Sequence, residues 1–534
     1  MRAFHIDLNH ANPTAERLQR WLGHLAGIGY DTILWEVEDA VAWQTIAPCA
    51  APDAFTREEF RAVLAEGTRL GLTHIPLLQT LGHCEYVLRN KAYAHLTEIP
   101  GSAAQYCPSH AEVVPLLHRL IAEYIEVFGD ITRFHLGMDE ATHLGSCPVC
   151  AAKVSEIGLT GLYAEHLQAL RPPLTERGIQ PMIWADMALS HQETIAALPR
   201  DVVLCDWNYF TWAGQERAWL WTRRDPVTLH NEPVDPHSLT ADERQRFGQD
   251  LWPHGEAAAF DPCYTATQLA RHGYPVVACP TTSCYGDNVF APRFWDKLRN
   301  TVTWARRGAG ADLEGSIVTS WTVHQHPWEL QSVLIDAGAL ALAYPAEDAA
   351  CLAERLVART FGCIPEPLIR AWELLSEPCL FSQVFNLGYS KSTIPSDASV
   401  GLALLDRLFS QNHLARELER CCERRLGYLE AGTLIAGSQA AAGRGHELLA
   451  LWDLAARNLA ERAAGAACLI RWRTAGEAAA DAPERLTQLR TLRAETAQAY
   501  RSLGSKPLRL AQQMQWLYGP VESALEIAAT GGRS

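Results

Sequence analysis

The 534-residue chain is poor in several features that mark specialised classes of protein. Charged residues make up only 20%, and acidic residues outnumber basic ones to give a formal net charge of −15. Surfaces that bind nucleic acid or anionic membranes normally show a basic excess, so we expect neither kind of partner. The sequence also lacks an uncharged run of about 18 apolar residues, the length that predicts a membrane-spanning helix.

Signs of secretion are lacking as well. Residues 1–8 read as a strand, without the apolar run and small-residue cleavage site of a secretory signal. The 15 cysteines are odd in number and lie in apolar contexts such as those of Cys205 and Cys279, which is typical of reduced, buried thiols. We therefore expect a cytoplasmic protein. With 48% hydrophobic residues and a length beyond one core, the chain predicts two or three packed domains.

Residues 1–345 alternate short apolar patterns with amphipathic helical ones. The predicted strands are residues 3–8, 32–38, 74–79, 133–139, 180–186, 202–208, 275–280 and 316–321. Apolar residues at helical spacing follow the first, second and third of these strands, over residues 15–29, 56–70 and 113–128 respectively. Eight strands with intervening helices predict an α/β fold, a (β/α)8 TIM barrel, with a doubly wound sheet as the structural alternative.

The ends of the predicted strands favour the barrel. Most strands end in polar or aromatic residues, among them Asp7, Glu36, Glu38, Gln79, Asp139, Trp184, Asp186, Trp207 and Trp321. A barrel gathers all of these ends on one face, where the chemistry of such folds lies, whereas a doubly wound sheet gathers only a few. The first strand is not followed by Gly-x-Gly-x-x-Gly, so a dinucleotide site has no support.

Two segments depart from the barrel pattern. Residues 209–274 are too long for one connection and predict an insertion on the active face, either a lid or wall or a unit with its own tryptophan-containing core. Residues 346–534 are rich in Ala, Leu, Arg and Glu and predict an all-α C-terminal domain, with helical patterns over 402–431, 446–464 and 482–502. We assign no chemistry to these helices, and a homodimer formed through them stays open.

The sequence Phe-His-Leu-Gly-Met-Asp-Glu at residues 134–140 carries the main candidate chemistry. Alternation along a strand places His135, Gly137 and Asp139 on one face and turns the apolar residues between them toward the outer helices. Glu140 lies where the strand becomes a loop and can also face the pocket. Two adjacent carboxylates can divide their roles: one stays ionised and stabilises positive charge, while the other, with a raised pKa, donates a proton.

His-x-Gly-x-Asp-Glu at residues 135–140 resembles the signature of glycoside hydrolase family 20, the β-N-acetylhexosaminidases, and the likeness is closest to the hexosaminidase D branch. It extends through residues 33–39, 75–88, 143–145 and 184–187. The resemblance implies a (β/α)8 barrel that removes terminal β-linked GlcNAc or GalNAc from a glycoside or glycoconjugate, with no cofactor and no metal. The arginine that many members carry after the first strand is absent, and the insertion is longer than in the nearest branch.

The family's mechanism is retaining and assisted by the substrate. The resemblance implies that Glu140 protonates the leaving oxygen and then activates water, while Asp139 orients the 2-acetamido group and stabilises the oxazolinium ion. His83 matches a pocket histidine. Aromatic side chains suit the apolar face of a sugar and its acetamido methyl. The remaining candidates for substrate binding or its support are Trp184, Trp207, Trp321, Tyr285 (with Tyr209 as its rival), Asp7, Glu36, Glu38, Gln79, Glu85 and Asp186.

Three other interpretations remain open. Cys147-Pro148-Val149-Cys150 could be half of a structural zinc site, which Cys84, Cys107 or His143 would have to complete, but we expect reduced thiols there. The His-x-His at residues 324–326 would suit a metal-dependent hydrolase, although it follows the last predicted strand instead of the first. The barrel could also be a glycan-binding protein without turnover.

Overall fold

Eight parallel strands close into a barrel in the computed structural model of the protein, which describes residues 1–191, 193–224, 231–256, 258–322, 327–382, 399–475 and 479–531. The strands are β1 (Arg2–Asp7), β2 (Thr32–Glu36), β3 (Thr73–Leu77), β4 (Arg133–His135), β5 (Gln180–Trp184), β6 (Val203–Trp207), β9 (Val276–Cys279) and β11 (Ser316–Ser320). They pair in this order, and β11 pairs back to β1. The closed order confirms the predicted barrel and excludes the doubly wound sheet. A short strand, β10 (Thr281–Ser283), also pairs with β11.

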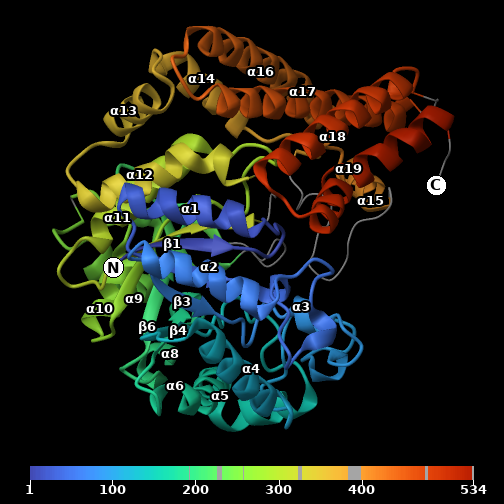
Figure 1. The fold of residues 1–534 in the computed structure, drawn as a ribbon. Helices are drawn as coiled ribbons and strands as arrows, with labels where there is room; N and C mark the ends of the chain where they lie inside the picture. Colours follow the sequence, from blue (N-terminus) through green and yellow to red (C-terminus); the bar gives the residue numbers. More distant parts are fainter. Residues whose placement is uncertain are drawn as a thin grey trace.

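Helices cover the outside of the barrel (Figure 1). They are α1 (Ala15–Ile28), α2 (Arg57–Arg69), α3 (Glu85–Leu88), α4 (Val113–Phe128), α5 (Pro148–Leu170), α6 (Pro172–Thr175), α7 (Asp186–Ser190), α8 (Glu193–Ala197), α10 (Tyr264–Arg271), α11 (Phe294–Gly308) and α12 (Ser332–Ala343). Local sequence sets their ends: Thr14 caps α1, Gly29 ends it in the left-handed region, and Thr56 forms a capping box with Glu59 at α2. The three predicted helices correspond to α1, α2 and α4.

Apolar side chains from the strands fill the interior of the barrel. The buried members of this core are Ala3, Leu34, Ile75, Leu77, Met182, Trp184, Val203, Cys205, Val277, Cys279 and Ile317. Trp207 and Trp321 are partly buried and pack against the same core. These tryptophans lie at or just after the carboxyl ends of their strands, so the core ends in an aromatic layer on the face where the site is predicted.

The strand predicted over residues 133–139 is shorter than expected, because β4 ends at His135. Phe134, Leu136 and Met138 pack into the core that includes the outer helices, as the alternation predicted. Beyond His135, however, the backbone enters the left-handed region at Gly137 (φ 65°), Met138 (φ 71°) and Glu140 (φ 47°). Positive φ is incompatible with a continuing strand. The acidic pair therefore lies on a tightly turned segment instead of an extended one.

The insertion over residues 209–274 has its own small core. The antiparallel pair β7 (Ala218–Arg224) and β8 (Asn231–Val234) packs with α9 (Ala241–Leu251) and α10. Trp252 belongs to this core, whereas Trp219 stacks on Phe210, with ring centroids 4.6 Å apart. Trp221 instead lies edge-on to Trp207, with ring centroids 4.6 Å apart. The insertion is thus both a packed unit and a neighbour of the strand-end aromatic layer.

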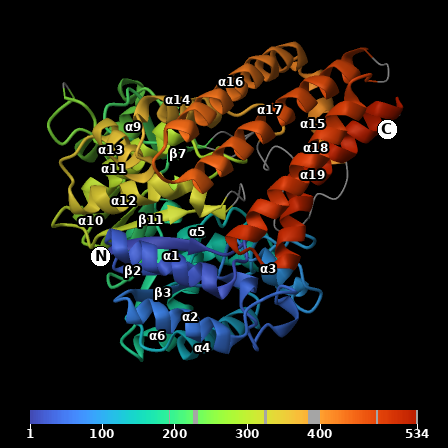
Figure 2. The same cartoon turned by 45° about the horizontal axis from the view of Figure 1, so that its top comes forward.

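The C-terminal part of the chain is helical and lies along one side of the barrel (Figure 2). Its helices are α13 (Ala349–Phe361), α14 (Pro365–Ser376), α15 (Ser399–Ser410), α16 (Leu414–Ala441), α17 (His446–Ala475), α18 (Ala482–Leu503) and α19 (Pro507–Thr530). The prediction of one helix over residues 402–431 is wrong. Asn412 takes a left-handed conformation (φ 57°), and the N–H of His413 donates back to the carbonyl of Leu408, which ends α15 as a C-cap does.

A buried ion pair joins α19 to the barrel. Arg509 donates to Asp39 at 2.9 Å, and both side chains are almost wholly buried. Arg89 binds the second oxygen of the same carboxylate at 2.6 Å. The ring of Trp516 lies edge-on to that of His10, which follows β1, with centroids 5.6 Å apart. The helical part therefore contacts the loops at the carboxyl ends of the first two strands.

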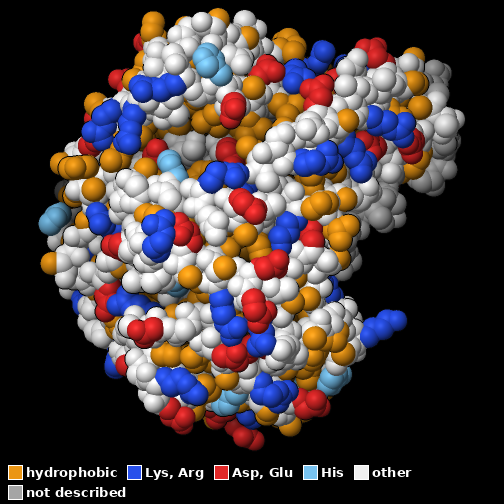
Figure 3. Space-filling view, in the orientation of Figure 1, with side chains coloured by type: hydrophobic (Ala, Val, Ile, Leu, Met, Phe, Trp, Pro, Cys, Tyr) orange, Lys and Arg blue, Asp and Glu red, His pale blue; other side chains and the backbone are white. Residues whose placement is uncertain are grey.

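The molecular face in Figure 3 carries acidic and basic side chains side by side, without a large area of one sign. Among the described residues, no helix combines the length and the apolar character that crossing a bilayer requires. The His-x-His at residues 324–326 lies outside the described residues.

Candidate active site

Asp139 and Glu140 meet at a shared histidine. The Nε2 atom of His83 lies 3.4 Å from Oδ2 of Asp139 and 3.2 Å from Oε2 of Glu140. The side chain of Asp139 is 8% exposed, whereas that of Glu140 is 49% exposed. The two neighbouring carboxylates therefore occupy different environments: one is enclosed and the other opens to solvent.

Charge and burial oppose each other at this cluster. Burial alone would lower the pKa of His83, but the carboxylates of Asp139 and Glu140 outweigh it and raise that pKa to about 10. Burial raises the pKa of Asp139, which the imidazolium of His83 partly opposes and the charge of Glu140 reinforces. His83 is consequently a cation at neutral pH and neutralises part of the negative charge of the acidic pair.

Two glycines allow the backbone to bring these groups together. A Cβ at Gly82 would collide with the backbone carbonyl oxygen of Asp139, and one at Gly137 would collide with Oε1 of Gln79. Gly137 also needs its positive φ of 65°. The glycine of the His-x-Gly-x-Asp-Glu motif thus admits Gln79 into the barrel, and Gly82 lets the His83 loop approach the acidic pair.

Asp186 is the first residue of α7, just after β5, and it hydrogen-bonds to the segment that carries the acidic pair. Its Oδ2 accepts the backbone N–H of Glu140 at 2.9 Å. Burial, with the charge of Asp139 as the next contribution, raises the pKa of Asp186 to about 8. The residue therefore fixes the position of Glu140 through its backbone, which makes it a positioning residue in this geometry.

Aromatic rings form one wall of the site. Trp184 is fully buried, with its ring centroid 4.4 Å from that of His135 and 5.7 Å from that of Trp321. Trp207 stacks on Tyr209 at 5.0 Å, and the indole N–H of Trp321 donates to the hydroxyl of Tyr209 at 2.8 Å. The structure thus brings the three predicted tryptophans together, with Tyr209 between two of them.

The carboxylate of Glu36 contacts two side chains, those of His5 and Gln79. Its Oε2 lies 3.1 Å from Nε2 of His5, and its Oε1 accepts a hydrogen bond from the amide of Gln79 at 3.1 Å. The ring of His5 also lies edge-on to Trp321, with centroids 4.8 Å apart. This polar chain connects β1, the end of β2 and the segment after β3, and His5 brings it into contact with the aromatic wall.

Asp7 ends β1, and Glu38 begins a short turn after β2. Oδ2 of Asp7 accepts hydrogen bonds from both the backbone N–H and the hydroxyl of Thr322, each at 2.9 Å, and Oδ1 accepts the N–H of Asn9. The amide of Asn9 donates to Glu38 at 3.3 Å. Asp7 therefore ties together the loops that follow β1 and β11, where the barrel closes.

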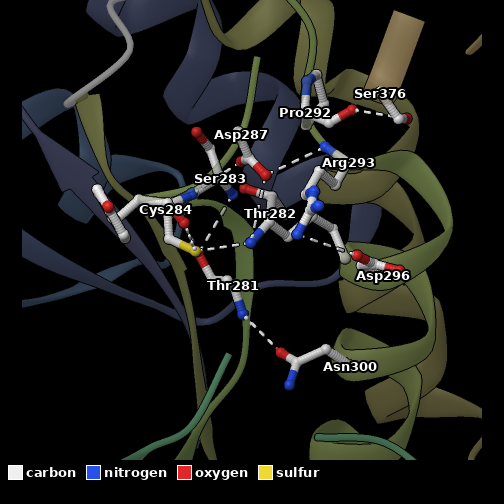
Figure 4. Close-up of polar contacts among 12 residues, drawn as sticks. Thr281, Thr282, Ser283, Cys284, Asp287, Pro292, Arg293, Asp296, Asn300 and Ser376 are labelled. Carbon is white, nitrogen blue, oxygen red and sulfur yellow. Dashed lines mark hydrogen bonds and ion pairs between the residues drawn. The ribbon is translucent and has the colours of Figure 1, made fainter. Parts of the chain in front are cut away.

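Tyr285 follows β10 on a loop held by a buried charged group. The thiol of Cys284 lies 2.6 Å from Nζ of Lys297, and Nζ lies 3.4 Å from Oδ1 of Asp287; these three side chains are almost wholly buried. Figure 4 shows the same loop, with Asp287 turned toward Cys284 and Arg293. Tyr285 itself is half-buried, and Tyr209 is the tyrosine that stacks on Trp207 in the aromatic wall.

Sequence reasoning missed the contributions of the helical part and of the segment before α4. Arg509 and Trp516 contact the loops next to the site from at least 470 positions away, and no motif marks them. Glu98 and Cys107 lie beside Cys147 and Cys150, and of these two only Cys107 is a partner that the sequence suggests for the Cys-x-x-Cys motif. In both cases the tertiary fold makes the association.

The fold and the strand-end carboxylates place the protein among (β/α)8 barrels with an acidic site. Residues 38–224 match the family model for the glycosyl hydrolase family 20 catalytic domain. Hexosaminidase D from Homo sapiens is 26% identical over 353 residues, which cover 64% of each chain. Hexosaminidase D from Bos taurus is 30% identical over 198 residues, covering 35% of this chain and 56% of that relative. The chain thus spans about two thirds or less of these curated relatives, and the matches confirm the predicted resemblance to the family and to its hexosaminidase D branch.

The chain is also similar to solved structures. A family 20 exo-β-N-acetylglucosaminidase from Vibrio harveyi, in complex with N-acetylglucosamine, has 17% identity and a TM-score of 0.46, covering 66% of this chain and 56% of that one. Chitobiase from Flavobacterium johnsoniae has 14% identity and a TM-score of 0.48, covering 97% of this chain and 78% of that one.

Proposed function

We propose that the barrel is the catalytic domain of an exo-acting, retaining β-N-acetylhexosaminidase that uses the substrate's own acetamido group as nucleophile. The observation that carries the proposal is the joining of Asp139 and Glu140 through Nε2 of His83, within the segment that matches the family 20 catalytic domain. Adjacent carboxylates in unlike environments suit two different tasks in one reaction. The substrate would be a terminal β-linked GlcNAc or GalNAc.

Glu140 suits the task of general acid and base. Its side chain is half-exposed, so it can reach a glycosidic oxygen that enters from solvent. In the first step it donates its proton to the leaving oxygen as the bond from that oxygen to C1 breaks. In the second step its carboxylate takes a proton from the water that attacks C1. His83, 3.2 Å from Oε2 of Glu140, can orient the carboxyl group between these steps.

Asp139 suits the task of holding the acetamido group. Its Oδ1 is buried and has no hydrogen-bond partner among the described residues, whereas its Oδ2 faces His83. A buried acceptor without a partner is costly, and the N–H of an acetamido group would satisfy it. The same carboxylate would then stabilise the positive charge that develops as the acetamido carbonyl oxygen bonds to C1.

The aromatic wall suits the apolar parts of the sugar. Trp184, Trp207 and Trp321 surround the strand ends, and sugar C–H groups and an acetamido methyl pack well on such rings. Glu36, at the end of β2, accepts a hydrogen bond from Gln79, two residues after β3, and both would bind or support hydroxyl contacts. The ratio of release from β-GlcNAc and β-GalNAc substrates measures the preference between the two sugars.

The first test compares chromogenic β-GlcNAc, β-GalNAc and β-glucose substrates. The β-glucoside lacks the acetamido group, so we expect release only from the two N-acetylhexosamine substrates. Glu140→Gln and Asp139→Asn should each lower kcat/KM by about 10²- to 10⁴-fold, the range that a positioned acid–base group contributes. Asp130→Asn is a matched control, because Asp130 is an exposed acid before β4. Proton NMR of the first product should show the β anomer, as retention requires.

Failure to release N-acetylhexosamine from every β-linked substrate would refute the proposal. Sugar binding by wild type and Glu140→Gln alike, without turnover, would establish the glycan-binding alternative. A metal-dependent hydrolase would lose turnover in a chelator while its unfolding temperature stayed unchanged. Turnover that resists the chelator but is lost in both acidic variants would support substrate-assisted catalysis.

A further inference from the structure

Three thiols and one carboxylate converge beside the segment that follows the acidic pair. Sγ of Cys107 lies 3.6 Å from Sγ of Cys147 and 3.6 Å from Sγ of Cys150. Oε2 of Glu98 lies 3.3 Å from Sγ of Cys150. All four ligand atoms lie within 4.8 Å of one another, and Glu98, Cys107 and Cys150 are buried.

These distances match the ligand shell of a tetrahedral zinc ion. With Zn–S bonds of about 2.3 Å, two sulfur ligands at tetrahedral angles lie about 3.8 Å apart, and a sulfur and an oxygen ligand are slightly closer. A disulfide would instead require sulfur atoms about 2.05 Å apart. The four residues come from two separate segments, residues 98–107 and 147–150, so the arrangement is a product of the fold.

We propose that Glu98, Cys107, Cys147 and Cys150 form a structural Zn²⁺ site. A site with four protein ligands has no open position for substrate, so its role is structural and lies outside the reaction proposed above. Cysteine thiolates favour zinc over the hard cations magnesium and calcium.

Two backbone N–H groups donate to ligand residues of the cluster. Cys147 caps α5, and its Sγ accepts the N–H of Cys150 at 3.3 Å. The N–H of Cys147 donates to Oε1 of Glu98 at 2.9 Å, which leaves Oε2 directed toward the thiols. Such outer hydrogen bonds orient ligands and help thiolates to form at a helix N-terminus. An open cavity of about 590 Å³, lined by Glu98, Cys107 and Cys147 among others, provides a path for the ion.

The site would hold together two loops that carry the proposed chemistry. Cys147 lies seven residues after Glu140, and the N–H of His143 donates to the amide oxygen of Gln105 at 3.0 Å. On the other side, the N–H of Tyr106 donates to the carbonyl of Leu81, close to His83. Zinc would therefore fasten the segment before α4 to the loop between Glu140 and α5.

The test measures the metal content of the protein, independently of turnover. Protein purified in a reducing buffer without chelator should hold about one zinc per chain by inductively coupled plasma mass spectrometry. Cys107→Ser should lose this zinc, whereas Cys351→Ser, at an exposed thiol on α13, should retain it. Glu98→Gln keeps an oxygen that can accept the N–H of Cys147 but removes the ligand oxygen, so zinc affinity should fall at least about tenfold. Cobalt replacement should give the sulfur-to-cobalt charge-transfer band of a thiolate site.

If Cys107→Ser fails to fold, two further measurements decide the question. In the wild type, a thiol reagent should modify these three cysteines only when zinc is released, which a metallochromic dye reports in parallel. Zinc-free wild type should melt at a lower temperature and regain its melting temperature when Zn²⁺ is returned. Less than one tenth of an equivalent of zinc, even after titration with Zn²⁺ under reducing conditions, would overturn the proposal, as would a native disulfide from Cys107. Because metal content is read independently of turnover, an inactive protein that holds zinc would refute only the hexosaminidase function.

Discussion

The buried Lys297 offers a sharp test of how the loop of Tyr285 is held. Its ammonium group lies 2.6 Å from the thiol of Cys284 and 3.4 Å from the carboxylate of Asp287, and Lys297 and Asp287 are at most 2% exposed. Lys297→Met keeps most of the volume of the side chain but removes its charge and its hydrogen-bond donors. Asp287 would then be a buried carboxylate without its cation.

The expected loss of unfolding free energy depends on the hydrogen bonds that Asp287 keeps in the variant. Removing one partner of a buried ion pair costs about 3–5 kcal/mol. Asp287 still accepts the N–H groups of Cys284 at 3.0 Å and Arg293 at 3.1 Å, which places the expected loss of unfolding free energy at the lower end, about 3 kcal/mol. In Asp287→Asn/Lys297→Met no buried charge is left unpaired, so this double variant should be less destabilised than the sum of the single variants by about 1–3 kcal/mol.

The pH dependence of the unfolding free energy supplies a second readout. Burial raises the pKa of Asp287 and Lys297 opposes that rise, so removing Lys297 raises the pKa further. A carboxyl group with a raised folded-state pKa stabilises the fold when protonated, and this contribution is lost as the pH rises through that pKa. The penalty of Lys297→Met should therefore be larger at pH 8 than at pH 5. Urea unfolding followed by tryptophan fluorescence measures it, and a loss below about 1 kcal/mol at pH 8, or additive single variants, would refute the reasoning.

Two further predictions concern the acidic pair and the docking of α19. The folded-state pKa of His83, about 10, lies above the usual value of about 6.5, so its stabilising contribution is complete below about pH 6.5 and lost as the pH rises toward 10. The melting temperature of wild type should fall more over that interval than that of His83→Gln, and parallel curves would contradict this. Arg509→Met leaves Asp39 with Arg89 alone and should cost about 2 kcal/mol and speed proteolysis of α19. The exposed control Arg501→Met should behave as wild type, and equal proteolysis rates for the two variants would argue against this docking role.

The barrel could be predicted because its sequence signals are local and repeat. Apolar runs marked all eight strands, and most ended in polar or aromatic residues. Eight such runs separated by helical spacing allow few closed arrangements. The acidic pair could be predicted for a related reason. His135 to Glu140 form one contiguous motif at the end of one strand, so no long-range contact is needed to propose it.

Errors arose where a local signal was ambiguous. Helical composition continues from residue 402 to 431, and only the left-handed backbone at Asn412 divides α15 from α16. The alternation of β4 held for the packing of Phe134, Leu136 and Met138, but it could not show that the backbone turns sharply at Gly137. Asparagine and glycine permit positive φ, yet their presence alone does not require it.

The sequence by itself determined the eight-strand pattern, the acidic motif and the tryptophans at the strand ends, because each depends on neighbours in the chain or on one strand's periodicity. Only the tertiary structure decided that His83 lies between Asp139 and Glu140, that Cys107 and Glu98 meet the Cys-x-x-Cys pair, and that Arg509 reaches Asp39. These contacts join residues 40 to 470 positions apart. The packing of strands, helices and loops around the barrel determines which of these residues meet. Periodicity along the chain reports only local structure, so it cannot predict these contacts.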